Sequence, residues 1–111
     1  MTELDAEDAK IVTLARSARA RVGASAGAAV RDTDGRTYAA SSVTLPSMSL
    51  TALRLAVAMA ASAGASGLEA AVTDASTVAT GDLDAVRDLG GPEVPVLLVD
   101  VRGELREVVR T

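Results

Sequence analysis

The chain has 111 residues, of which 49% are hydrophobic and 23% are charged, a balance typical of one globular domain and too apolar for a disordered chain. With a net charge of −4, one tyrosine and no tryptophan or phenylalanine, it lacks the basic stripe and the stacking rings of a general nucleic-acid binder. It has no cysteine and no histidine, which excludes disulfides, thiol chemistry and a zinc-dependent hydrolytic centre.

Neither an export signal nor a membrane span is predicted. Residues 1–8 are acidic, the opposite of the basic start of a signal peptide. The longest apolar run, residues 55–61, is far shorter than the roughly 18 residues that a membrane span needs. We therefore expect a soluble, cytoplasmic protein without membrane contacts.

The first predicted helix covers residues 4–20. Thr2 and Asp5 have the spacing of a capping box, and acidic residues at the start with arginines at the end complement the helix dipole. We interpret these arginines as a solvated helix end rather than an anion site. Apolar residues at three-to-four residue spacing predict one buried face: Ile11, Leu14, Ala15, Ala18 and Val22.

A hairpin of two strands, residues 26–31 and 36–43, is predicted next. The connection Asp32-Thr33-Asp34-Gly35 contains Asp-Gly, a strong signal for a tight turn because glycine accepts a positive φ. The same residues match only the beginning of a calcium-binding loop, so a turn is the better interpretation.

A second helix is predicted over residues 50–63, after a break at Pro46 and Ser47 and before Gly64. Its apolar residues cover most of its circumference, which predicts burial at the centre of the domain: Leu50, Leu53, Leu55, Val57, Met59, Ala60 and Ala61. Arg54 interrupts this surface and needs either a path to solvent or a partner, for which a carboxylate across an interface is one candidate.

The remaining predicted elements are a strand, a short helix and two strands, over residues 68–72, 81–89, 94–99 and 104–109. The complete order is α-β-β-α-β-α-β-β. It predicts an α/β fold of one domain over residues 1–111, a three-layer α-β-α sandwich with a mixed five-stranded sheet. The order also roughly suits a dynein-light-chain-like or profilin-like interaction domain.

Short stretches along the whole chain carry a family resemblance. They are Leu14-Ala15-Arg16, Gly27-Ala28-Ala29-Val30, Asp34-Gly35-Arg36, Leu50-Thr51 with Arg54, and Val94-Pro95-Val96-Leu97-Leu98-Val99-Asp100. Together with the element order they resemble the small cytidine deaminase family. The resemblance concerns scaffold residues and implies that family's fold. The family's last helix would follow the final strand, and we expect it to be lacking because the sequence ends at Thr111.

The chemical residues of that family are not matched. There a zinc-bound water attacks the base, cysteines or a histidine hold the metal, and a glutamate transfers protons. The resemblance places the first ligand at Thr51 and the glutamate at Leu53, and shifting it by two residues gives Leu53 and Leu55. The other two ligands would fall within residues 80–84, where Gly81 and Asp84 stand. The substrate-contacting positions become Ala24, Ser42 and Thr44.

No other catalytic chemistry is indicated. Lys10 is the only lysine, and a surface position in the first helix is its better interpretation. Asp82 and Asp84 could form a pair for acid–base work, but aspartates near a helix start are normally caps. We expect no catalytic residue, no metal and no cofactor.

Three functional hypotheses remain. The first is a catalytically inactive deaminase-like protein that self-associates as a dimer or tetramer or contacts another protein, with Leu50, Arg54 and Val57 as interface candidates. The second is a remodelled pocket that binds a nucleoside, a nucleotide or an anion, with polar contacts from Ser47, Ser49, Thr51 and Thr80. The third is the alternative fold named above, which would also be a dimerising, non-enzymatic module.

Overall fold

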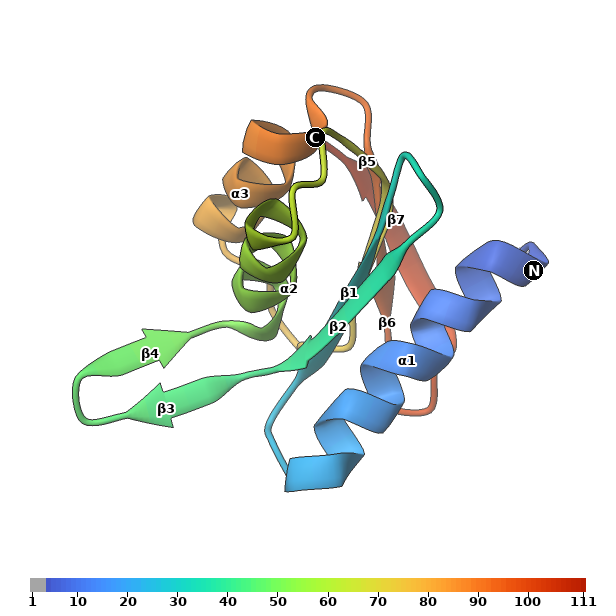
Figure 1. The fold of residues 1–111 in the computed structure, drawn as a ribbon. Coiled ribbons are helices and arrows are strands. Elements are labelled where there is room, and N and C mark those ends of the chain that lie inside the picture. The colour runs from blue at the N-terminus through green and yellow to red at the C-terminus, as the bar shows by residue number, and fades with distance from the viewer. Residues whose placement is uncertain (1–3) are drawn as a thin grey trace.

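The computed structural model describes residues 4–111. Its elements follow the predicted order, with two additional short strands between the first hairpin and the second helix (Figure 1). Helix α1 covers Ala6–Val22, and its N-cap is Asp5, whose side chain accepts a hydrogen bond from the Asp8 amide at 2.8 Å. The predicted contribution of Thr2 lies outside the described residues. Helix α1 thus begins and ends two residues later than predicted.

The five-stranded mixed sheet is confirmed. Its strands are β1 (Gly27–Asp32), β2 (Thr37–Ser41), β5 (Leu68–Thr73), β6 (Pro95–Val99) and β7 (Leu105–Arg110). The order across the sheet is β2-β1-β5-β6-β7. Strands β5 and β6 are parallel, and every other neighbouring pair is antiparallel. The chain connects the parallel pair through helix α3 (Thr80–Gly90).

Helices cover both faces of this sheet, which confirms the three layers (Figure 1). Helix α1 packs on one face through Ile11, Val12 and Ala15. Helices α2 (Ala52–Ser62) and α3 pack on the other face. Two members of the buried face predicted for α1 lie elsewhere: Leu14 is half-buried, and Val22 is 65% exposed because the last turn of the helix runs past the sheet.

The two additional strands form a small hairpin that projects from the body of the molecule (Figure 1). Strand β3 (Val43–Leu45) pairs antiparallel with β4 (Met48–Leu50), and Pro46 and Ser47 make the turn between them. We call residues 43–50 the arm. The predicted start of the second helix at Leu50 is therefore wrong, since that residue belongs to β4 and Thr51 caps a helix that begins at Ala52.

The expected burial of α2 on most of its circumference is also wrong. One side of the helix packs into the core through Leu53, Ala56, Val57 and Ala60. The opposite side is open to solvent, and Met59 there is 40% exposed. Because α2 contacts the sheet on one side and α3 beside it, nothing in the described chain covers the remaining face. No described helix is long and apolar enough to cross a membrane.

Candidate functional site

A pocket of about 230 Å³ lies where α2 and α3 begin. Three other segments complete its wall: the entry to β1, the end of β2, and the turn that follows β5. Hydroxyl groups dominate its polar lining, which comprises Ser25, Ser42, Thr51, Thr73, Ser76 and Thr77. Small apolar side chains and one leucine form the rest: Ala26, Ala52, Leu53 and Ala75.

One carboxylate, that of Asp82, reaches this pocket from the first turn of α3. The residue is 5% exposed, and its Oδ1 atom accepts a hydrogen bond from the Thr51 hydroxyl at 2.9 Å. The same oxygen lies 2.9 Å from Nε of Arg54, which forms an ion pair with it. Because Thr51 also caps α2 by accepting a bond from the Arg54 amide at 3.2 Å, the starts of both helices are joined by one polar cluster.

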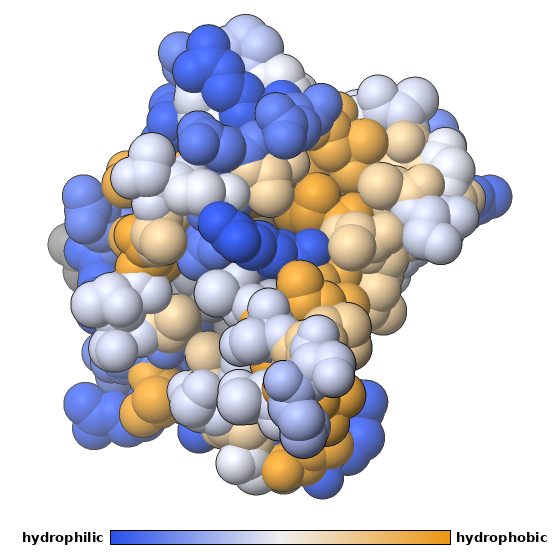
Figure 2. All heavy atoms as spheres, turned by 90° about the vertical axis from the view of Figure 1, so that its left-hand side faces the viewer, coloured by the Kyte–Doolittle hydropathy of each residue, from blue (hydrophilic) through white to orange (hydrophobic). Residues whose placement is uncertain are grey.

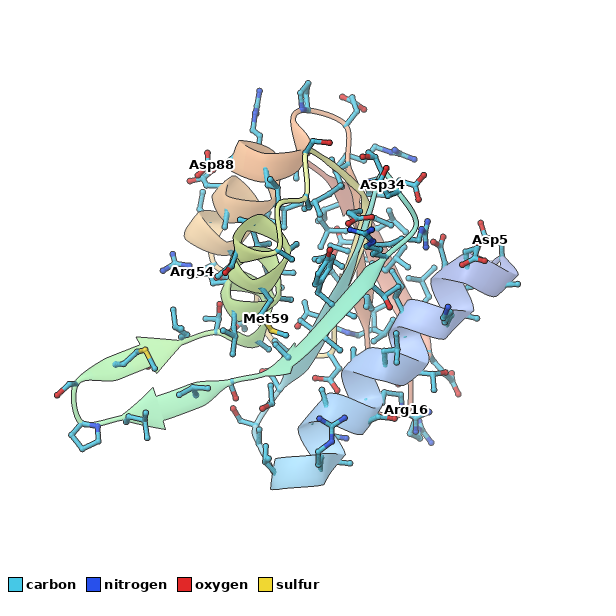
Figure 3. All side chains as sticks on the ribbon, in the orientation of Figure 1. Asp5, Arg16, Asp34, Arg54, Met59 and Asp88 are labelled. Carbon is cyan, nitrogen blue, oxygen red and sulfur yellow. The ribbon has the colours of Figure 1, made fainter. Side chains whose placement is uncertain are left out.

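The arginine of this cluster lies close against the backbone of α3. A Cβ atom added at Gly81 would collide with Nη2 of Arg54 and lie 3.2 Å from its Cζ. Arg54 extends from α2 toward the side where α3 lies (Figure 3). The partner that the sequence required for Arg54 is thus a carboxylate of the same chain, and the side chain is also 46% exposed.

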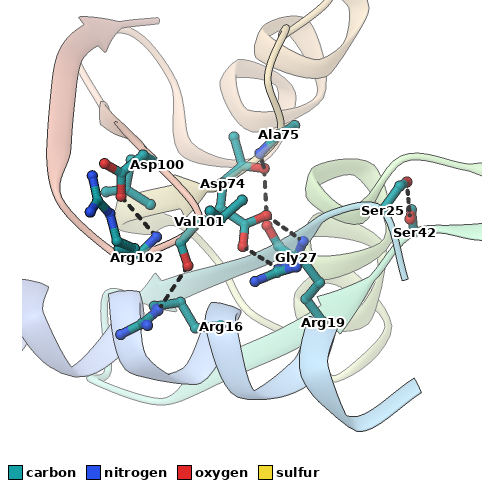
Figure 4. Close-up of polar contacts among 12 residues, drawn as sticks. Arg16, Arg19, Ser25, Gly27, Ser42, Asp74, Ala75, Asp100, Val101 and Arg102 are labelled. Carbon is teal, nitrogen blue, oxygen red and sulfur yellow. Dashed lines mark hydrogen bonds and ion pairs between the residues drawn. The ribbon is translucent and has the colours of Figure 1, made fainter. Parts of the chain in front are cut away.

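The turn after β5 is fixed by a second polar cluster (Figure 4). Asp74, whose side chain is fully buried, accepts hydrogen bonds from the Gly27 amide at 2.8 Å and from Nε of Arg19 at 2.9 Å. Thr73 donates to the carbonyl oxygen of Gly27 at 3.0 Å. These bonds tie the entry of β1 to the end of β5, so the pocket wall on this side is rigidly anchored.

The positions singled out in the sequence are only partly brought together. Ser42, Thr51 and Leu53 line the pocket, and Leu53 is 2% exposed, so it fills core space. Gly81 lies beside Arg54 at the edge of the cluster. Asp84 is exposed on α3, and Thr44 is exposed on the arm, so neither lines the pocket.

The role of Asp82 is one that sequence reasoning does not reveal, because an aspartate in the first turn of a helix is normally a cap. Asp82 makes no capping bond here and instead faces α2. Of the interface candidates, Leu50 is half-buried in the arm, whereas Val57 is 7% exposed and belongs to the core. Val57 is therefore unable to present a contact surface to a partner.

A second hollow, a shallow and wide-open groove of about 460 Å³, lies between β2 and the open side of α2. Its lining is mostly apolar and consists of Tyr38, Leu55, Ala58, Met59, Ser62 and Ala63. The groove and the arm lie on neighbouring parts of the molecule, because β2 leads directly into the arm and the arm leads into α2 (Figure 1).

Comparison with known proteins agrees with this architecture. A model of the cytidine deaminase-like family matches residues 4–103, which is most of the chain. The chain belongs to the cytidine deaminase-like family. The alternative of a dynein-light-chain-like or profilin-like fold is therefore wrong.

Two solved structures are similar to this deaminase-like chain. Cytidine deaminase from Burkholderia pseudomallei superposes with a TM-score of 0.78 at 22% identity, over 90% of this chain and 89% of that one. Cytidine deaminase from Mycobacterium leprae gives a TM-score of 0.70 at 19% identity, over 97% and 94% of the two chains. No curated protein matches the sequence. At these identities the likeness establishes the fold.

The residues of the pocket do not fit the zinc ion that the deaminase fold implies. Zinc in such sites takes three or four converging ligands, normally histidine nitrogen, cysteine sulfur or carboxylate oxygen. The sequence has neither histidine nor cysteine, and within the described part of the chain Asp82 is the single carboxylate in the pocket lining. Among residues 4–111 no group of three potential ligands converges on any point.

Proposed function

We propose that this deaminase-like chain is a non-catalytic member of its family that works through protein contacts, first of all with copies of itself. The absence of catalysis is inferred from the donor set of the pocket. Leu53 stands where the resemblance places the proton-transferring glutamate. The cluster of Thr51, Arg54 and Asp82 contains one carboxylate, which is too few ligands to hold zinc.

The main evidence for a contact surface is a nearly uncharged stretch of the chain. Arg54 is the only charged residue between Arg36 and Glu69, in a chain in which 23% of all residues are charged. This stretch forms β2, the arm and α2. Because the cores of protein interfaces are depleted in charged side chains, a continuous neutral surface of this kind favours burial against another protein.

Large hydrophobic side chains are exposed on the same surface. Leu45 and Met48 of the arm are 56% and 47% exposed, and Met59 of α2 is 40% exposed. Figure 2 shows hydrophobic atoms gathered on the side of the molecule that carries the arm and α2. A two-stranded hairpin is marginally stable in water when nothing packs on it, so the arm needs a covering surface that the described chain does not supply.

The shapes of the arm and the groove favour a second copy of the chain as the binding partner. The arm is an apolar projection, and the groove lined by Tyr38, Leu55 and Met59 is an apolar depression on the same molecule. An arm that enters the groove of a neighbour would cover both surfaces at once. A reciprocal exchange of this kind produces a closed dimer, and a repeated exchange produces a larger ring.

Sedimentation velocity over a range of protein concentrations tests the proposal. The native chain should sediment as a dimer or a larger closed assembly. The double variant Leu45→Asp/Met48→Asp and the single variant Met59→Asp should each shift it to monomer, with far-UV circular dichroism confirming that the fold persists. The matched control is Val101→Asp, which replaces a 54% exposed valine in a distant turn and should leave the assembly intact.

A monomer at all concentrations, or equal behaviour of the arm variants and the control, would overturn self-association. The absence of catalysis has its own test. The protein is incubated with cytidine and excess zinc, and the absorbance change of base deamination is followed. No turnover above the protein-free rate is expected, and sustained turnover that scales with protein concentration contradicts the proposal.

A further inference from the structure

We infer that the pocket at the starts of α2 and α3 binds a small, neutral, non-aromatic polyol. This inference concerns a different part of the molecule from the arm and the groove, and it does not depend on self-association. It follows from the hydrogen-bonding groups that the pocket leaves free, from its charge balance and from the side chains that are absent from its lining.

The first free group is the second carboxylate oxygen of Asp82. The contacts from Thr51 and Arg54 both go to Oδ1, and no hydrogen bond to Oδ2 is found among residues 4–111. No fully buried side-chain oxygen in that part of the chain lacks a partner, so Oδ2 must be reached by solvent. Asp82 is 95% buried overall and lines the pocket, so we take the pocket as the side from which a ligand reaches Oδ2. A ligand there meets a hydrogen-bond acceptor.

Hydroxyl groups of the pocket supply further hydrogen-bond donors and acceptors. The side chains of Ser25 and Ser42 lie 3.0 Å apart and share one hydrogen bond, which leaves one of their two hydroxyl hydrogens available. Ser76 and Thr77 are exposed at the pocket and make no side-chain hydrogen bond within the described chain. A hydroxyl both donates and accepts, so the free groups match a ligand that itself carries several hydroxyls.

The charged side chain of the pocket lining disfavours charged ligands. Among residues 4–111, Asp82 is the one charged side chain of the pocket lining, which contains no lysine or arginine, so an anion would meet a carboxylate and no cationic side chain. A cation gains little, because Arg54 already pairs with that carboxylate at 2.9 Å. A buried ion without a counter-ion is costly, and the net-neutral Arg54–Asp82 pair therefore selects a neutral ligand. The nucleotide and anion forms of the pocket hypothesis would depend on the amides at the two helix starts, against the charge of Asp82, and the phosphate titration below tests them.

The lining also selects against aromatic rings. Stacking of a planar base needs an aromatic or guanidinium face. Tyr38 is the only aromatic residue of the chain and lines the groove rather than the pocket. The apolar part of the pocket consists of Ala26, Ala52, Leu53 and Ala75, which can contact the carbon chain of a polyol without offering a flat surface.

The experiment is an NMR titration of the ¹⁵N-labelled full chain with xylitol as the probe. Saturable shifts are expected for backbone amides that line the pocket, such as Ser42, Thr51 and Thr77, while amides of the arm stay unchanged. Parallel titrations use cytidine and inorganic phosphate. Saturation by cytidine or phosphate but not by xylitol would overturn the polyol assignment, and so would the absence of saturable shifts with all three probes.

Variants separate binding from folding. The double variant Ser25→Ala/Ser42→Ala removes two pocket hydroxyls and should weaken xylitol binding roughly tenfold, the loss expected for one or two hydrogen bonds. Asp82→Asn, which keeps an acceptor oxygen but unbalances the pair, should weaken it as well if the fold persists. Ser47, which the pocket hypothesis offered as a polar contact, lies in the turn of the arm and does not line the pocket, so Ser47→Ala is the matched control and should leave binding unchanged. Equal affinity in the double variant and in the native chain contradicts the inference.

Discussion

Oδ1 of Asp82 in the first turn of α3 lies 2.9 Å from Nε of Arg54 in the first turn of α2. The carboxylate is buried and the guanidinium is half-exposed, so solvent weakens the attraction from one side only. The Thr51 hydroxyl completes the contact at 2.9 Å. The cluster of Thr51, Arg54 and Asp82 therefore holds together the starts of α2 and α3, which pack on the same face of the sheet.

The first prediction concerns the stability that this cluster provides. Asp82→Ala should lower the free energy of unfolding by about 2 kcal/mol, because it removes a buried acceptor and leaves Thr51 and Arg54 without their partner. Urea denaturation followed by far-UV circular dichroism measures the change. The control is Asp84→Ala, an exposed carboxylate on the same helix, for which a change below about 0.5 kcal/mol is expected. Similar losses in both variants would refute the assigned role of Asp82.

The second prediction uses the close approach of Arg54 to Gly81. Alanine inside a helix is normally more stable than glycine by roughly 0.5–1 kcal/mol. Here the added Cβ would displace the guanidinium, so Gly81→Ala should bring no gain in the native background. In an Arg54→Ala background the same substitution should be stabilising, by less than the gain in a helix interior because Gly81 stands in the first turn of α3. Urea midpoints of the four proteins form the thermodynamic cycle, and additive effects would show that the contact carries no energy.

Much of the fold could be predicted because its signals are local. The Asp-Gly turn, the hydrophobic periodicity of α1 and the uninterrupted apolar run of β6 each follow from neighbouring residues. The arm differs from the prediction of a simple break at Pro46 and Ser47. Polar and apolar residues alternate on either side of that pair, in Val43-Thr44-Leu45 and Met48-Ser49-Leu50. Two alternating segments around two turn residues are the pattern of a hairpin.

The site could be predicted less well, since its geometry depends on how helices dock. Asp82 and Asp84 are equivalent by composition and spacing, and only the packing of α3 beside α2 turns the first inward and the second to solvent. In the same way Val57 and Met59 are both apolar residues of α2, yet the first is 7% and the second 40% exposed. A sequence without alignment gives no signal for the rotation of a helix whose apolar residues surround it.

The third prediction concerns the buried carboxylate of Asp74. Asp74→Ala should lower the free energy of unfolding by about 3 kcal/mol, because the buried Gly27 amide and the Arg19 guanidinium both lose their acceptor. Chemical denaturation again provides the measurement. Glu69→Ala breaks a more exposed ion pair with Arg31, also at 2.9 Å, and should cost less than about 1 kcal/mol. Equal costs would mean that burial does not distinguish the two pairs.

The fourth prediction concerns acid unfolding. Burial opposes ionisation of Asp32, but hydrogen bonds from the Arg36 amide, the Tyr38 hydroxyl and the Asp34 amide outweigh it and lower the pKa of this carboxyl. Its stabilising contribution is then present above the unfolded pKa, about 3.9, and is lost as the pH falls through the lower folded pKa. Urea midpoints should therefore fall more steeply between neutral and strongly acidic pH in the native chain than in Asp32→Asn. Asp34→Asn, on the exposed side of the same turn, should keep the native slope.

The fifth prediction concerns the pKa of Tyr38, whose hydroxyl donates this hydrogen bond to Asp32. The bond from the Tyr38 hydroxyl to Oδ2 of Asp32, 2.9 Å long, together with burial raises the pKa of this phenol above its ordinary value near 10. Tyr38 is the only tyrosine and there is no tryptophan, so the ultraviolet absorbance of tyrosinate reports this single group. Titration should give a pKa above that of a free tyrosine in the native chain and a lower value in Asp32→Asn. Since the folded pKa is the higher one, the stabilisation holds below the unfolded pKa and is lost as the pH rises through the folded pKa. Identical titration curves for both proteins would show that the bond to Asp32 does not control the phenol.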